Sequence, residues 1–111
     1  MRVAAGDIGT NSTRLLIAEV AGGRVVPVER RVVVTGLGAG VDRSGFLGEA
    51  GMALTLGVLA GYRAAAAAAG VAALRVVATA AVRDATGNRE EFLDRAEAAL
   101  AWAQGEGTHI L

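Results

Sequence analysis

The chain has 111 residues, of which 53% are hydrophobic, and its 11 basic residues balance 11 acidic ones. It has no cysteine, every basic residue is arginine, and the one histidine is His109. These counts exclude thiol nucleophiles, disulfides, a P-loop lysine, a lysine Schiff base and a serine–histidine–aspartate triad around a core site. Carboxylates, hydroxyls, arginines and backbone amides remain, and they suit phosphoryl chemistry assisted by an oxygen-liganded cation such as Mg²⁺.

Three runs rich in valine, isoleucine and leucine open the chain, at residues 2–7, 14–20 and 24–34. A tight turn at 21–23 separates the second from the third, so we expect an antiparallel meander. The glycine-rich residues 35–47 predict a loop.

A helix is predicted over residues 49–69. Its apolar side chains recur at helical spacing on one face and are Met52, Leu56, Leu59, Tyr62 and Ala66. Residues 73–79 predict a strand buried on both faces, and its helical connection to the preceding strand makes it parallel to a sheet neighbour.

A second helix is predicted to begin at Asn88. The spacing from Asn88 to Glu91 resembles a capping box with Asn88 as the cap. The apolar face of this helix comprises Phe92, Leu93, Ala96, Ala99, Leu100 and Ala103. Residues 108–111 then read as the beginning of a further strand.

Small polar residues follow directly after the first predicted strand. Asp7 ends that strand, and Gly9, Thr10, Asn11 and Ser12 form the turn after it. Successive backbone N–H groups in such a turn make an anion-binding concavity, to which the hydroxyls and the amide add donors. Taken alone, these residues fit an ordinary hairpin turn equally well.

The charges lie along the chain without long single-sign blocks, so we expect no binding to DNA, RNA or a membrane surface. The first residues lack the layout of a signal peptide. The longest apolar stretch, 64–74, is shorter than the roughly 20 residues that span a bilayer. We therefore expect a soluble, cytoplasmic protein.

The order strand, strand, strand, helix, strand, helix resembles an α/β fold, the actin-like ATPase (ribonuclease H-like) subdomain, incomplete at its C-terminus. Residues 7–16, DIGTNSTRLL, resemble the first phosphate motif of the exopolyphosphatase and guanosine pentaphosphate phosphohydrolase (Ppx/GppA) family. Residues 78–85, ATAAVRDA, resemble that family's strand-end segment, which carries an arginine near the phosphate. The resemblance covers residues 2–99, and residues 1–111 are expected to form a partial N-terminal subdomain, with the second subdomain absent.

The resemblance implies roles for the matched residues. Asp7 would help to place a divalent cation, Mg²⁺ or another, through water. Gly9 to Ser12 would cradle a phosphate, and Arg83 would contact phosphate oxygens with its planar fork. The alternatives are that Arg83 is a solvated surface arginine and that Asp7 is only a strand-end turn residue.

The chain also departs from the family pattern. Gly36 stands where many relatives have an arginine before the glycine-rich loop. The family's catalytic glutamate segment and its second phosphate loop are not found in the sequence. The nearest glutamates, Glu97 and Glu106, lack the matching surroundings, so no catalytic residue is assigned and we expect negligible phosphatase activity from the chain alone.

By resemblance, the reaction is hydrolysis of terminal phosphate from polyphosphate, or removal of the 5′ phosphate of guanosine pentaphosphate, and the sequence does not choose between them. A homodimer is compatible with a full-length relative, and the oligomeric state stays open. Three alternatives remain: an actin-like sugar kinase, which also begins with an Asp-x-Gly-Thr turn; a non-enzymatic nucleotide-binding or assembly module; and a truncated or frameshifted product that does not fold stably.

Overall fold

The computed structural model describes residues 1–101 and 110 of the chain. Its strands are β1 (Arg2–Ile8), β2 (Ser12–Ala21), β3 (Arg24–Val34) and β4 (Ala73–Ala78). Its helices are α1 (Val41–Ser44), α2 (Glu49–Ala68), α3 (Ala80–Asp84) and α4 (Arg89–Leu100). The long elements follow the predicted order, and the short helices α1 and α3 are additions to it.

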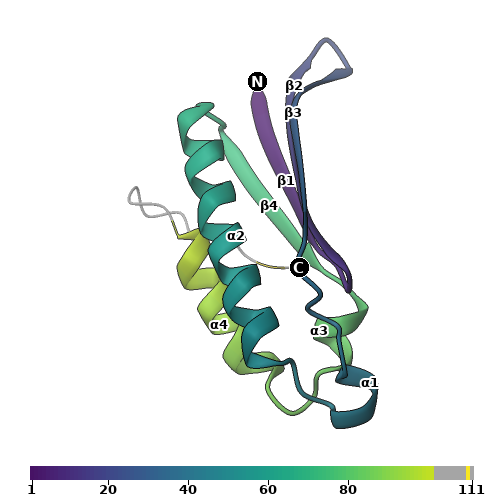
Figure 1. Cartoon of the computed structure of the whole chain (residues 1–111). Helices are drawn as coiled ribbons and strands as arrows, with labels where there is room; N and C mark the ends of the chain where they lie inside the picture. The colour runs from purple at the N-terminus through teal and green to yellow at the C-terminus, as the bar shows by residue number, and fades with distance from the viewer. Residues whose placement is uncertain (102–109, 111) are drawn as a thin grey trace.

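The strands form one sheet in the order β3-β2-β1-β4. β1 pairs antiparallel with β2, and β2 pairs antiparallel with β3, which confirms the predicted meander. β4 pairs parallel with β1, so Ile8 and Ala78 lie side by side where the two strands finish. Figure 1 shows α1 and α3 at this end of the sheet.

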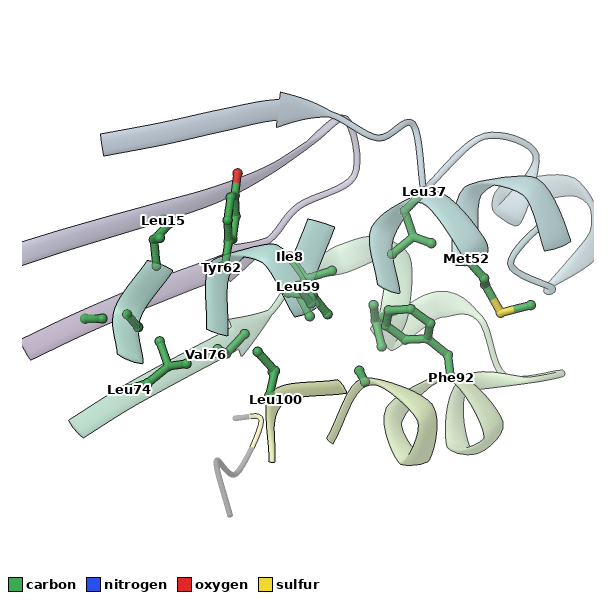
Figure 2. Close-up of a cluster of buried hydrophobic side chains, with 14 of the residues drawn as sticks. Ile8, Leu15, Leu37, Met52, Leu59, Tyr62, Leu74, Val76, Phe92 and Leu100 are labelled. Atoms are coloured by element: carbon green, nitrogen blue, oxygen red, sulfur yellow. The ribbon is translucent and has the colours of Figure 1, made fainter. Parts of the chain in front are cut away.

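The core lies between the sheet and the two long helices, α2 and α4, which cover the same face (Figure 1). The buried cluster includes side chains from three strands and both helices (Figure 2): Ile8, Leu15, Ile17, Leu74, Val76, Met52, Leu59, Tyr62, Ala66, Phe92, Ala96 and Leu100. The apolar faces predicted for both helices are therefore the faces that pack. Leu56, Leu93 and Ala99 lie at the margin, partly buried.

β4 does not have the two buried faces that its apolar run predicted. Leu74 and Val76 are buried under the helices, whereas Arg75 and Val77 on the opposite face are exposed. The prediction was wrong because an apolar run shows that a strand can be buried, not that an element packs on each side of it.

The capping box predicted at Asn88 does not form. Asn88 precedes α4, but its side chain makes no cap hydrogen bond. Its Oδ1 instead accepts a hydrogen bond from the Leu47 N–H at 2.8 Å, and its Nδ2 donates to the Leu47 carbonyl at 3.0 Å. A two-sided bond to one backbone residue satisfies both halves of the amide, so Asn88 joins α4 to the segment before α2.

The predicted loop at 35–47 contains the one-turn helix α1. Gly40 precedes α1 with φ 80° and Gly45 ends it with φ 72°. Both glycines adopt the left-handed backbone that other residues rarely enter, which explains the glycine-rich composition of this segment. A helix of four residues is too short to show a hydrophobic period, so no sequence pattern predicts it.

α2 is long and apolar enough, by length and composition alone, to cross a membrane, with a mean hydropathy of 1.2. The stretch 64–74 considered in the sequence overlaps α2 only at residues 64–68 and ends in β4. One face of α2 is buried against the sheet and α4, and its Tyr62 hydroxyl donates a hydrogen bond to the Thr13 carbonyl. These contacts place one face of α2 in the core, and 28% of its apolar window is buried.

Ile110 forms a parallel bridge with Val76 of β4, in agreement with a further strand beginning near the end of the sequence. The other residues of that predicted strand lie outside the described residues, as do Ala103, Glu106 and His109.

Candidate functional site

The turn between β1 and β2 lies at the end of the sheet where β1 and β4 both finish. It consists of Gly9, Thr10 and Asn11, and Ser12 begins β2. Thr79, directly after β4, donates to the Ile8 carbonyl from both its N–H and its hydroxyl, each at 3.2 Å. The ends of β1 and β4 are thereby tied together beside the turn.

Two carbonyl oxygens of the turn are bonded to other parts of the chain. Thr10 O accepts from the Gly38 N–H at 2.9 Å, and Asn11 O accepts from the N–H groups of Thr35 and Gly36, both at 3.0 Å. Within the turn, the Gly9 N–H donates to the Ser12 carbonyl at 3.0 Å. The carbonyls of Thr10, Asn11 and Ser12, which would repel an anion, are therefore already occupied.

Several hydrogen-bond donors of the turn, unlike these carbonyls, have no partner among the described residues. Within residues 1–101 and 110, the N–H groups of Thr10 and Asn11 and the side chains of Thr10, Asn11 and Ser12 make no hydrogen bond. Thr10 and Asn11 are exposed. A turn with bonded carbonyls and free N–H groups has the geometry of an anion-binding concavity. Because the carbonyls are fixed before a ligand arrives, the donors need little rearrangement to bind one.

Two glycines make this close packing feasible. A Cβ at Gly9 would lie 2.8 Å from the Ser12 carbonyl oxygen, so the turn has room only for glycine. A Cβ at Gly38 would overlap Thr10 Cγ2 and lie 3.2 Å from the Cβ of Ala81. Gly38 therefore lies between the turn and α3, and both neighbours need it to lack a side chain.

Gly36, where the family resemblance led us to expect an arginine, has φ 62°. Its N–H is one of the two donors to the Asn11 carbonyl. An arginine would be strained in this left-handed conformation, so glycine here fits the backbone that supports the turn.

Asp7 lies on β1 opposite Arg14 of β2 and Val77 of β4. Its Oδ1 is buried and makes no hydrogen bond, and Arg14 forms no ion pair with another described residue. A buried carboxylate oxygen without a donor is unfavourable unless a cation or water reaches it. Asp7 also lines an open pocket of about 460 Å³ on the face of the sheet opposite the helices.

Asp7 therefore fits a divalent cation held largely by water. In the part of the chain that the structure describes, no three histidine, cysteine, aspartate or glutamate residues come together as a metal-binding group. Mg²⁺ commonly takes one or two carboxylates and keeps several waters, which one carboxylate from this chain would satisfy.

Arg83 lies on α3, with its side chain 73% exposed. Its Nε is 3.6 Å from Asp84 Oδ1, and its backbone carbonyl accepts a hydrogen bond from Arg89 Nη1 at 2.7 Å. An exposed ion pair of this kind is weak, so the guanidinium is free to turn to a phosphate. No described contact joins Arg83 to the turn, which α3 approaches through Ala81 and Gly38.

Hydroxyl groups behind the turn form a cluster that the sequence did not indicate. Thr13 Oγ1 and Thr35 Oγ1 are 2.9 Å apart and buried, and the Tyr62 hydroxyl donates to the Thr13 carbonyl at 2.7 Å. Burial raises the pKa of Tyr62, so its hydroxyl keeps its proton at neutral pH. The only signal in the sequence was a tyrosine on an apolar helix face, whose hydroxyl needs a partner when buried.

Glu97, one of the two glutamates nearest to the expected position of a catalytic base, is exposed on α4. It makes no hydrogen bond or ion pair with another described residue. Glu106 lies outside the described residues.

Comparison with known proteins gives matches over most of the chain. Residues 16–103 match the Ppx/GppA phosphatase family. Exopolyphosphatase 2 of Mycobacterium tuberculosis is 41% identical over 95 residues, which are 82% of this chain and 30% of that protein. A Ppx/GppA family member from Aquifex aeolicus superposes with a TM-score of 0.86 and 35% identity, over 100% of this chain and 35% of its own. An exopolyphosphatase from Cytophaga hutchinsonii superposes with a TM-score of 0.85 and 25% identity, over 100% and 34%.

The chain thus spans about a third of the length of the relatives that it matches. The fold is the predicted actin-like α/β subdomain, with the sheet and helices in the expected order and incomplete relative to the solved structures. The chain belongs to the Ppx/GppA phosphatase family.

Proposed function

We propose that the chain forms one phosphate-binding wall of an exopolyphosphatase-type hydrolase site. In this proposal Gly9 to Ser12 hold a terminal phosphate of polyphosphate, Arg83 contacts its oxygens, and Asp7 holds a hydrated divalent cation. The observation that carries the proposal is the orientation of the turn: the carbonyls of Thr10, Asn11 and Ser12 are bonded inside the protein, while the N–H groups of Thr10 and Asn11 bond to no described residue. The name of the mycobacterial relative favours polyphosphate as the substrate class.

In this proposal the residues named above bind the phosphate and the cation, and the general base comes from outside these 111 residues. A bound divalent cation would offset the charge that develops on the transferred phosphoryl group. The turn would hold the phosphate oxygens through backbone donors, and Arg83 through two parallel N–H bonds. We propose that the chain by itself binds phosphate without hydrolysing it, because a water needs a general base to be activated.

Calorimetric titration of the chain with tripolyphosphate and Mg²⁺ tests this assignment. Binding by the parent chain is expected, and Arg83→Ala should weaken it by about tenfold or more, since a hydrogen bond to a charged group contributes about 1.5–3 kcal/mol. Asp7→Asn should remove the part of the affinity that depends on Mg²⁺. Arg95→Ala, which removes the same charge from an exposed position on α4, is the matched control.

Equal affinities of the Arg83→Ala and Arg95→Ala variants would contradict the role of Arg83. Release of phosphate from polyphosphate by the parent chain would contradict binding without hydrolysis. Guanosine pentaphosphate, titrated in parallel, distinguishes the two substrates of the family. ATP that binds more tightly than tripolyphosphate would favour the sugar kinase or nucleotide-binding alternative.

A further inference from the structure

Tyr62 of α2 makes a long-range contact with the strand that leaves the turn. Its hydroxyl donates to the carbonyl of Thr13, 49 residues away, at 2.7 Å, and both residues are buried. Figure 2 shows the hydroxyl pointing away from the centre of the apolar cluster while the ring remains within it. The ring packs in the apolar core, whereas the hydroxyl bonds to the Thr13 carbonyl of β2.

The same strand residue is held from a second side. Thr13 Oγ1 lies 2.9 Å from Thr35 Oγ1, in the segment that follows β3. The N–H groups of Thr35 and Gly36 both donate to the Asn11 carbonyl in the turn. We call Tyr62, Thr13 and Thr35 the brace, since together they join α2, β2 and the segment after β3 directly behind the turn.

We propose that Tyr62 is a positioning residue for phosphate binding, acting through Thr13 and Thr35 to hold the turn with its N–H groups directed at the ligand. This inference rests on the proposed function of the turn. The Tyr62 hydroxyl satisfies the buried Thr13 carbonyl, which fixes the peptide planes at the start of β2. Thr13 lies opposite Val33 in the sheet, so Tyr62 adds a donor from α2 to a carbonyl of the central strand. Without that donor the start of β2 loses its tie to α2, and a shift of the strand or entry of a water would follow.

A displaced turn would bind phosphate less well even in a folded chain. An anion site is effective when its donors are fixed in advance, so a small tilt of the Thr10 and Asn11 N–H groups lowers affinity without removing any group that touches the ligand. The brace therefore affects the site at a distance from it.

The test is Tyr62→Phe, which removes the hydroxyl and keeps the ring. We expect the variant to stay folded, to bind tripolyphosphate about three- to tenfold more weakly than the parent in calorimetry, and to shift the NMR amide signals of Thr10 and Asn11 in the free protein. Thr55→Val is the matched control, because it also removes a buried hydroxyl from α2. Among the described residues, that hydroxyl bonds to the Gly51 carbonyl within the helix at 2.7 Å and to no other group. Its affinity should equal that of the parent.

A second pair of variants keeps the test decisive if Tyr62→Phe fails to fold. Thr35→Ser retains the hydroxyl of the brace and should bind like the parent, whereas Thr35→Val removes it and should bind more weakly. Equal affinities across these variants, with the parent binding normally, would overturn the positioning role and leave the phosphate site intact. A parent chain that does not bind tripolyphosphate would overturn the proposed function and this inference together.

Discussion

The Gly38→Ala variant is expected to bind tripolyphosphate about tenfold more weakly than the parent chain. The added Cβ would overlap Thr10 Cγ2 and press on the Cβ of Ala81, while the Gly38 N–H is bonded to the Thr10 carbonyl at 2.9 Å. Thr10 is exposed and Ala81 is buried, so the turn is the partner that moves. Overpacking of this kind costs about 1–3 kcal/mol, and relieving it displaces the donors of the site. Calorimetry measures the affinity.

Gly57→Ala is the control for this prediction. Gly57 lies within α2 with no atom near the position of its missing Cβ. Alanine there should raise the free energy of unfolding by about 0.5–1 kcal/mol and leave the affinity for tripolyphosphate unchanged. A Gly38→Ala variant that binds as tightly as the parent would show that the turn does not depend on the segment behind it.

The Phe92→Ala variant is expected to lose about 3–5 kcal/mol of its free energy of unfolding. Phe92 is 0% exposed, and its ring points from α4 into the buried cluster (Figure 2). The cavity left by its removal lies where α4 meets α2, and the total stability of a small domain is only about 5–15 kcal/mol. Urea unfolding followed by circular dichroism gives the difference between variant and parent.

The same substitution at Phe46, the other phenylalanine of the chain, provides a matched control. Phe46 is 53% exposed and lies against Gly87 rather than in the core. Its replacement by alanine should cost clearly less than that of Phe92. Equal losses would mean that the contact between α2 and α4 does not carry the stability assigned to it.

The parts of the fold that could be predicted from sequence are those with a clear period or a sharp turn. The three opening strands, α2 and α4 have regular apolar patterns, and the structure places the strands, α2 and the start of α4 within one or two residues of the expected limits. α4 ends at Leu100, although its predicted apolar face extended to Ala103. The burial of β4 was overestimated, since the apolar run around Val77 does not reveal which face a helix covers. Asn88 has the spacing of a cap, but its side chain bonds to Leu47, which is distant in sequence.

Some residues of the candidate site could be recognised from the sequence, and others could not. Asp7 and the turn residues are consecutive, so their chemistry can be recognised in the sequence itself. The brace cannot be recognised, because Tyr62 reaches Thr13 across 49 residues and Thr35 reaches it across 22, through helix packing and strand register. The positive φ of Gly36 and the hydrogen bond from its N–H to the turn are likewise evident only in the structure.

The central claim is that the turn from Gly9 to Ser12 binds phosphate through its free backbone donors. Titration of the isotopically labelled chain with tripolyphosphate and Mg²⁺, followed by amide NMR, tests it residue by residue. The largest shifts are predicted at the N–H groups of Thr10 and Asn11, with the Arg83 guanidinium responding in parallel. Unchanged signals from Thr10 and Asn11 at a concentration that saturates binding elsewhere, for example around Arg95 on α4, would contradict the claim.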